Sequence, residues 1–243
     1  MLLALLYHKI GKGKCSNPLS LLESHFKWIA KNYSTVLPGE KLPSGLSVCL
    51  TFDDAFFDFY HLVFPLLQKY QLKAVLSIPT AYILDSTSLS SDQRLKEIQT
   101  ANMDSPLPSP AFCTWEELKI LSQSKHIHLA SHSVHHKPLL ASQKNVEEEL
   151  IHSKQTLESK LNLAITTFVY PFGKFDPLTH RLTQKHYSYI MRIGNALNTS
   201  WTNTQSLLYR INGDQLSHPR YPFSLPLHVK HSVKYILNTL LKK

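Results

Sequence analysis

Two adjacent carboxylates follow an apolar run that is typical of a buried strand. The run covers residues 48–52 and ends at Asp53 and Asp54. Neighbouring residues on a strand point to opposite faces, but where a strand ends the chain turns and both acids can face one cavity. Two like charges at such a short separation repel each other unless a cation or a shared proton compensates the repulsion. The pair therefore marks either a chemical site or the cap of a helix that begins near Ala55.

Two histidines four residues apart are the second chemical feature. His132 and His136 follow the apolar segment 127–130, and in a helical turn this spacing puts both rings on one side. Two neutral imidazoles and one carboxylate make the three-ligand shell of a catalytic divalent metal, with a position left for water. The histidine pair alone also fits a surface helix, but the Asp-Asp strand upstream favours a metal site. His135 breaks the spacing and is expected to face solvent.

The elements that must position these residues alternate between strand and helix. Apolar runs predict strands at residues 1–8, 35–37, 46–52, 73–78, 127–130, 166–170, 189–193 and 207–211. Helical spacing predicts helices at residues 18–32, 56–70, 143–160 and 227–241, and a further helix that opens with a Thr114–Glu117 capping box. Residues 85–112 lack clear periodicity and are expected to cross one mouth of the fold. This alternation predicts an α/β protein in which residues 1–243 form a single barrel domain of parallel strands.

Barrel enzymes carry their sites at the carboxyl ends of the strands. Besides the acids and the histidine pair, the predicted strand ends in this chain carry His8, the segment 171–173 and Arg210. Polar residues thus recur where a barrel would place a site. We therefore expect these residues to converge.

Composition excludes several other classes of protein. The 243 residues carry a formal charge of +9 with histidine neutral, but the basic residues are scattered, which argues against nucleic-acid binding and allows at most peripheral contact with an anionic membrane. Cys15, Cys49 and Cys113 are widely spaced, as expected for reduced thiols and not for a disulfide framework. Residues 1–8 read as a first strand and not as a signal or a membrane span, so a cytoplasmic location is expected.

These motifs together resemble the polysaccharide deacetylase family, carbohydrate esterase family 4, also called the NodB-homology domain. The residues that carry the resemblance are Thr51–Asp54, His132–His136 and Tyr170–Gly173, which follow the family's order and spacing. The resemblance covers almost the whole chain. It implies a NodB-like, distorted (β/α) barrel of seven or so parallel strands.

The resemblance also implies a role for each motif residue. One divalent metal ion, Zn²⁺ as is usual in the family, would be held by Asp54, His132 and His136. Asp53 would be the general base. A bound metal lowers the pKa of its water toward about 7, and a separate ionised carboxylate can take the proton. A backbone N–H near Phe172 would help to hold the oxyanion formed from an acetamide.

The general acid is expected on the first strand. The segment Leu5–Ile10 resembles the start of the subgroup that deacetylates poly-β-1,6-N-acetylglucosamine, in which the acid histidine lies on that strand. His8 is therefore the expected acid, with His218 as the next candidate. A histidine that only forms a hydrogen bond at a strand end is the alternative for His8.

Two positions depart from the family pattern. Ala55 replaces the glycine after Asp-Asp, which constrains the turn without removing a ligand. Val169 stands where many members have an arginine that orients the base. Arg210 is expected to supply that charge from another strand, and Arg192 is the second candidate.

The expected function is hydrolysis of N-acetyl groups on an amino sugar, with an N-acetylated glycan or a lipid-linked amino sugar as partner. The alternative is a catalytically weak or inactive glycan-binding module descended from the same enzymes. Such a module would be expected to lack the base or a metal ligand, yet Asp53, Asp54, His132 and His136 are all present.

Overall fold

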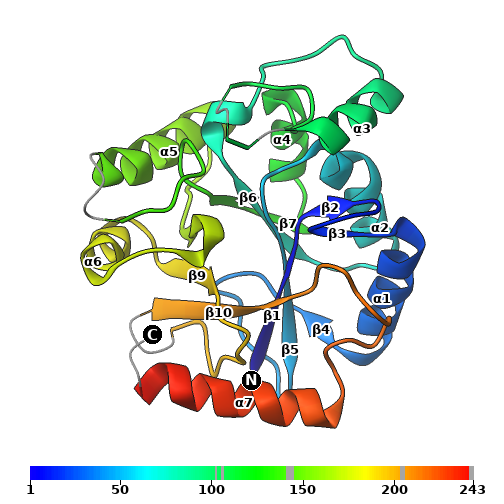
Figure 1. The fold of residues 1–243 in the computed structure, drawn as a ribbon, viewed down its shortest axis with the longest axis vertical. Coiled ribbons are helices and arrows are strands. Elements are labelled where there is room, and N and C mark those ends of the chain that lie inside the picture. Colours follow the sequence, from blue (N-terminus) through cyan, green and yellow to red (C-terminus); the bar gives the residue numbers. More distant parts are fainter. Residues whose placement is uncertain (102, 105–106, 141–144, 203–205, 241–243) are drawn as a thin grey trace.

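The structure of the protein is a computed structural model that describes residues 1–101, 103–104, 107–140, 145–202 and 206–240. Across these residues, strands and helices alternate along the chain and the helices lie outside the strands (Figure 1). No helix in the described part of the chain is both long and apolar enough to cross a membrane.

Within the described ranges, seven parallel strands close into a ring. Their order around the ring is β1 (Leu2–Tyr7), β10 (Leu207–Asn212), β9 (Tyr189–Ile193), β8 (Thr167–Val169), β7 (Ile127–Ser131), β6 (Ala74–Ile78) and β5 (Ser47–Phe52). Strand β1 closes the ring because it pairs with β10 on one side and with β5 on the other. The predicted barrel and its strands are thereby confirmed.

Three short strands lie outside the ring. Strand β4 (Ser34–Thr35) pairs with Ser47 and Val48, the first two residues of β5. Strands β2 (Lys9–Ile10) and β3 (Ser16–Asn17) form a small two-stranded ribbon directly after β1. This ribbon lies at the carboxyl end of β1, and so at the end of the barrel where sites are expected.

The helices cover the outside of the ring. They are α1 (Leu19–Asn32), α2 (Phe64–Lys69), α3 (Ser91–Thr100), α4 (Trp115–Ser122), α5 (Val146–Leu161), α6 (Pro177–His186) and α7 (Leu225–Leu240). The predicted capping box is confirmed, because the Thr114 hydroxyl accepts from the Glu117 N–H and the Glu117 side chain accepts from the Thr114 N–H.

Two helix predictions need correction. The helix expected at residues 56–70 is not one regular helix: a π-helical turn, Phe59–Val63, precedes α2. Pro65 lies in the first turn of α2, directly after the π-helical turn. The segment 85–112, expected to be irregular, contains α3, which begins with its own capping box at Ser90 and Gln93.

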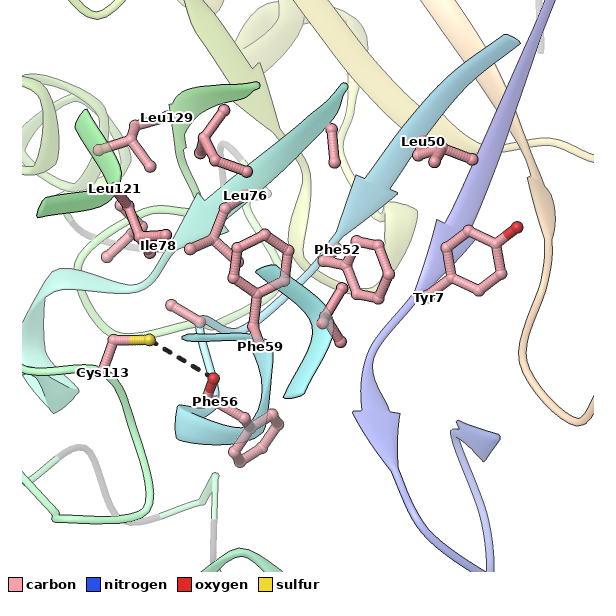
Figure 2. Close-up of a cluster of buried hydrophobic side chains, with 14 of the residues drawn as sticks. Tyr7, Leu50, Phe52, Phe56, Phe59, Leu76, Ile78, Cys113, Leu121 and Leu129 are labelled. Atoms are coloured by element: carbon pink, nitrogen blue, oxygen red, sulfur yellow. Dashed lines mark hydrogen bonds between the residues drawn. The ribbon is translucent and has the colours of Figure 1, made fainter. Parts of the chain in front are cut away.

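Alternate side chains of each strand face the helices and form the larger core. Phe52 of β5 packs against Phe59 of the π-helical turn with ring centroids 5.1 Å apart, and Leu50 of β5 and Leu76 and Ile78 of β6 belong to the same cluster (Figure 2). The other alternate side chains point into the ring. They form a second apolar cluster that includes Leu2, Ala4, Cys49, Val75, Ala130, Val169, Met191 and Leu208.

Candidate active site

The period of two along each strand places polar side chains inside the ring at its carboxyl end. Cys49 faces the interior, so Thr51 and Asp53 follow on the same side of the chain. The same step leads from Leu208 to Arg210 and from Ala130 to His132. The interior is therefore apolar at one end of the ring and ionisable at the other.

Asp53 is held by a buried arginine. Arg210, with no exposed surface, donates from Nη1 to Asp53 Oδ1 at 2.7 Å and from Nη2 to Oδ2 at 2.9 Å. The Ser77 hydroxyl donates to the same Oδ1 at 2.8 Å. Burial, the largest single influence, would raise the pKa of Asp53, but the charge and hydrogen bonds of Arg210 together with the nearby His132 and His8 outweigh burial and hold this pKa well below its usual range. Asp53 is therefore an ionised carboxylate with a fixed orientation.

The structure distinguishes the two arginines proposed to orient this carboxylate. Arg210 reaches Asp53 from β10, as expected. Arg192 instead donates from Nε to the Ile193 carbonyl at 2.9 Å, and its guanidinium lies over the ring of Phe175.

Asp54, His132 and His136 come together as a second group in the same site. One ligating atom from each lies within 4.8 Å of the others. Asp54 Oδ1 is 3.2 Å from His136 Nε2 and 3.6 Å from His132 Nε2. Burial lowers the pKa of each imidazole to about 4, so both rings are neutral at ordinary pH.

This group fits a divalent metal ion. Among the described side chains, Asp54 Oδ1 is buried without a hydrogen-bond partner, which is costly unless something else satisfies it. His132 Nδ1 bonds to the Val169 carbonyl at 2.7 Å, which leaves Nε2 facing Asp54 as a donor atom with a fixed orientation. Two neutral imidazoles and a carboxylate are also the donor set that zinc prefers in catalytic sites.

The loop after β7 brings the histidines together without a helix. Ser133 and His136 have left-handed backbones, with φ of 65° and 50°. The Ser133 hydroxyl accepts from the His136 N–H at 3.1 Å and so stabilises the turn. The helical turn invoked for this spacing is therefore wrong, although the two rings do meet at 4.8 Å between centroids. His135 faces away, as expected, and bonds to Glu149.

His8 reaches the site from the end of β1 with a partner that was not predicted. Its Nδ1 is 2.6 Å from Asp214 Oδ2, and its backbone N–H donates to Asp214 Oδ1 at 3.0 Å. Burial would lower the pKa of His8, but the bond to Asp214 and the charges of Asp54 and Asp53 raise it to about 9. His8 is therefore a protonated imidazolium at neutral pH. By contrast, His218 is exposed, and its ring accepts from the Arg220 N–H.

Asp214 was missed because nothing local marks it. It lies in a polar loop after β10, and its partner is 206 residues away along the chain. The only available signal was its position beyond the end of a strand, the feature that pointed to the other site residues.

Phe172 is exposed beside the site, and the buried Ala55 directly follows Asp54. The Phe172 backbone is left-handed (φ 57°), its side chain is 55% exposed, and its ring centroid is 4.7 Å from that of His136. A large exposed aromatic beside the histidines offers a face on which a sugar ring could pack. Asp54 and Ala55 are also left-handed, with φ of 73° and 54°, which explains why a glycine would be less strained at position 55.

Comparisons with known proteins show which family the chain resembles. A family model described as polysaccharide deacetylase matches residues 41–190. A Bacillus subtilis (strain 168) protein that bears the name of a polysaccharide deacetylase, YxkH, is 28% identical over 193 residues, or 74% of this chain and 60% of that protein. The poly-β-1,6-N-acetyl-D-glucosamine N-deacetylase of Escherichia coli K12 is 32% identical over 124 residues, or 47% of this chain and 17% of the enzyme. The chain thus spans less than two thirds of either relative.

Solved structures share the fold. Streptococcus pyogenes deacetylase PplD, in complex with acetate, superposes with a TM-score of 0.72 at 22% identity, covering 90% of this chain and 95% of that one. IcaB from Ammonifex degensii gives a TM-score of 0.68 at 16% identity, covering 88% and 92%. The matched family region contains both carboxylates and both histidines of the site, within a barrel that these structures share. The chain therefore belongs to the polysaccharide deacetylase family.

Proposed function

We propose that this protein is a metal-dependent hydrolase that removes N-acetyl groups from an amino sugar in a polysaccharide or glycolipid. The observation that carries the proposal is the opposite environment of two adjacent acids. Asp53 is held ionised by Arg210, whereas Asp54 is buried beside two neutral imidazoles with one oxygen unsatisfied. One acid is thereby suited to accept a proton and the other to bind a cation.

The metal site proposed is Asp54, His132 and His136, with Zn²⁺ as the ion. An ion held there supplies a Lewis acid next to the amide carbonyl and lowers the pKa of water. Asp53 accepts the proton from the attacking water, and Arg210 keeps Asp53 ionised and oriented for that transfer. We assign the backbone N–H of Phe172 to the developing oxyanion.

The proton for the departing amine comes from His8. An acid must be protonated before it acts, and against the lowering effect of burial the bond to Asp214 and the charges of Asp54 and Asp53 raise the His8 pKa to about 9. Asp214 is therefore a positioning residue that fixes the orientation and charge of His8. Base and acid are thus separate groups with pKa values on opposite sides of neutrality, as acid–base catalysis requires.

The substrate is proposed from the chemistry of the relatives. The E. coli relative is named for N-deacetylation of poly-β-1,6-N-acetyl-D-glucosamine, which supports an N-acetylated glycan as partner. The ring runs from β1 to β10, which supports one deacetylase domain over residues 1–243. Acetate release from N-acetylglucosamine oligomers, compared with release from a lipid-linked N-acetylglucosamine, distinguishes the polymer from the glycolipid.

The deciding experiment measures bound metal and acetate release on the same preparations. Wild type is expected to bind a stoichiometric divalent ion and to release acetate, Asp54→Ala to lose both, and Asp53→Asn to keep the ion and lose turnover. Wild type without stoichiometric metal contradicts the proposal. Metal binding without acetate release from any N-acetylated sugar would favour a glycan-binding module instead.

A further inference from the structure

A second group of metal-ligating side chains lies beside the proposed active site. His8, Cys15 and Asp214 each offer one ligating atom, and these atoms lie within 4.8 Å of one another. Asp214 is buried, but His8 and Cys15 are only half-buried, so an ion from solvent can reach them. The group shares His8 with the active site and shares no residue with Asp54, His132 and His136.

The fold holds these three residues together through the backbone. The Cys15 carbonyl accepts from the Lys9 N–H at 3.1 Å, which fixes the cysteine to the residue after His8. Asn17, on β3, donates from its side chain to the Gly213 carbonyl at 2.9 Å, directly before Asp214. The Gln215 N–H donates to the Ser16 carbonyl at 3.2 Å, directly after it. Strand β3, which directly follows Cys15, is therefore hydrogen-bonded to the residues on both sides of Asp214.

We propose that His8, Cys15 and Asp214 form a second, inhibitory binding site for a thiolate-seeking divalent ion such as Zn²⁺. Bond lengths of about 2.0 Å to nitrogen or oxygen and about 2.3 Å to sulfur put tetrahedral ligand atoms roughly 3.4–3.6 Å apart. The 2.6 Å contact between His8 Nδ1 and Asp214 Oδ2 must open by about 1 Å to reach this spacing, and because no separation in the group exceeds 4.8 Å, none must close by more than about 1.4 Å. Side-chain rotation can supply both movements.

The charges of the group suit a dication. A Cys15 thiolate and the Asp214 carboxylate together carry two negative charges, and His8 would bind as a neutral imidazole. Burial and Asp214 raise the pKa of Cys15, while Lys14 and Lys9 lower it. The ion must therefore displace a proton from the thiol and another from the His8 imidazolium, so its affinity rises with pH.

The functional consequence rests on the proposed role of His8. A histidine bound to an ion at this site has lost the acidic proton of its imidazolium, and the N–H that remains on the other ring nitrogen is a far weaker acid toward the departing amine. A moderate excess of Zn²⁺ would therefore inhibit turnover without displacing the ion held by Asp54 and its histidines. The binding itself requires only the geometry of the second group and not the proposed activity.

Cobalt gives this site an optical signal of its own. The purified protein, with its metal content measured first, is titrated with Co²⁺ while near-ultraviolet absorbance is recorded. Only thiolate ligation gives a strong sulfur-to-cobalt charge-transfer band, and the Asp54 group contains no sulfur. Wild type and Asp54→Ala should both develop the band, and Cys15→Ser should not. Cys49 and Cys113 are fully buried, so neither is available to an ion from solvent.

Zinc inhibition provides the second readout. Wild type and Cys15→Ser are each compared with their own activity at one equivalent of Zn²⁺, and the Zn²⁺ concentration for half inhibition should be roughly tenfold or more higher in Cys15→Ser. No band in wild type, a band that persists in Cys15→Ser, or unchanged inhibition would each overturn the proposal. Failure of the proposed function looks different, because an inactive protein would still show the cysteine-dependent band.

Discussion

At the scale of single residues, the site depends on the different surroundings of two neighbouring carboxylates. Asp53 has Arg210 and Ser77 as hydrogen-bond partners, and its pKa is lowered. Asp54 has no comparable partner among the described side chains, and burial raises its pKa. Adjacent residues of one type thus acquire different chemistry from the strands that face them.

Replacing Arg210 should disable the base while leaving the metal ligands intact. In Arg210→Met, Asp53 stays buried without its counter-charge, so its pKa rises and the acid limb of the kcat/KM profile moves to higher pH. We expect kcat to fall by roughly 10²-fold or more at neutral pH, the range seen when a preorganised charged partner is removed. The measurement is a pH–rate profile together with bound metal.

Arg192→Met is the matched control, because Arg192 is also on a ring strand but bonds to a backbone carbonyl. Its acid limb should stay in place. If the two variants have the same profile, Arg210 does not act through Asp53. Arg210→Lys restores a charge without the two-pronged contact, so it should recover only part of the rate.

Replacing Asp214 should weaken the proposed acid. A protonated acid loses activity as pH rises through its pKa, and Asp214 raises the pKa of His8. Asp214→Asn should therefore move the alkaline limb of kcat/KM to lower pH while bound metal at the first site stays unchanged. An alkaline limb that does not move would assign the proton donor to another group.

The same pair predicts a pH-dependent stability. The His8 pKa is about 9 in the fold against an ordinary 6.5, so its contribution to stability is full below about 6.5 and is lost as pH rises through about 9. The difference in unfolding free energy between wild type and Asp214→Asn should shrink over that window. Urea denaturation at a series of pH values measures the difference, and one that grows with pH contradicts the pairing.

At the scale of elements, α3 and α4 are joined by an ion pair that the sequence did not reveal. Arg94 of α3 donates to Glu117 at 2.5 Å and 3.0 Å. Its guanidinium also packs 3.5 Å from the ring centroid of Phe57, close to the loop that carries Asp54. Glu117 thus caps α4 and neutralises a cation that is 4% exposed. This contact joins α3 to the start of α4.

Removing Glu117 should therefore cost more than removing its capping partner. Thr114→Ala loses one cap bond, worth about 1 kcal/mol. Glu117→Ala also leaves Arg94 buried without a counter-charge, so about 3 kcal/mol or more is expected. Glu116→Ala, an exposed neighbour in the same turn, should stay within about 0.5 kcal/mol. Denaturant unfolding ranks the three, and an equal cost for Glu117 and Glu116 would contradict this account.

Which elements the sequence could predict follows from how their side chains are buried. The strand Tyr189–Ile193 was predicted to the residue, because apolar side chains mark it on both faces. Helix α3 was not predicted, because only Arg94 and Ile98 of its ten residues are buried, and one of these is a charged side chain. Amphipathic periodicity fails where a helix is held by an ion pair.

The residues of the candidate site also divide into those that the sequence could predict and those that it could not. Asp53, Asp54, His132 and His136 could be predicted because they lie next to strands or within a local motif. Asp214 could not be predicted, since a single carboxylate in a polar loop has no local pattern, and only the closed ring brings it to His8. Sequence therefore finds residues grouped along the chain and misses partners that meet only in space.

At the scale of the whole molecule, the ring holds its apolar packing and its ionisable side chains at opposite ends of the interior. One end of its interior is filled by apolar side chains, and the other holds Arg210, Asp53 and His132. The buried charges are compensated by one another at that end, apart from the carboxylate oxygen assigned to the ion. Ion binding should therefore be linked to the stability of the whole fold.

Chelation should lower the melting temperature. An ion at 100 times its Kd stabilises the fold by about 2.7 kcal/mol, which corresponds to roughly 5–10 °C for a chain of this size. Thermal unfolding of wild type with one equivalent of Zn²⁺, before and after chelation, measures the shift. Asp54→Ala should lose most of it, and an equal shift in both proteins would place the stabilising ion elsewhere.

The closure of the ring through β1 also determines at what point of synthesis the His8–Asp214 pair can form. Along the chain, β1 precedes both of its neighbours in the ring, β5 and β10, and all six of its residues are buried. Strand β10 and Asp214 leave the ribosome some two hundred residues later, as the His8–Asp214 separation of 206 positions records. Until β10 is made, β1 can pair with β5 but keeps one unpaired edge, which exposes the nascent chain to aggregation and to chaperones. The proposed proton donor is completed only when β10 joins β1, so a nascent chain that ends before Asp214 lacks the His8–Asp214 pair.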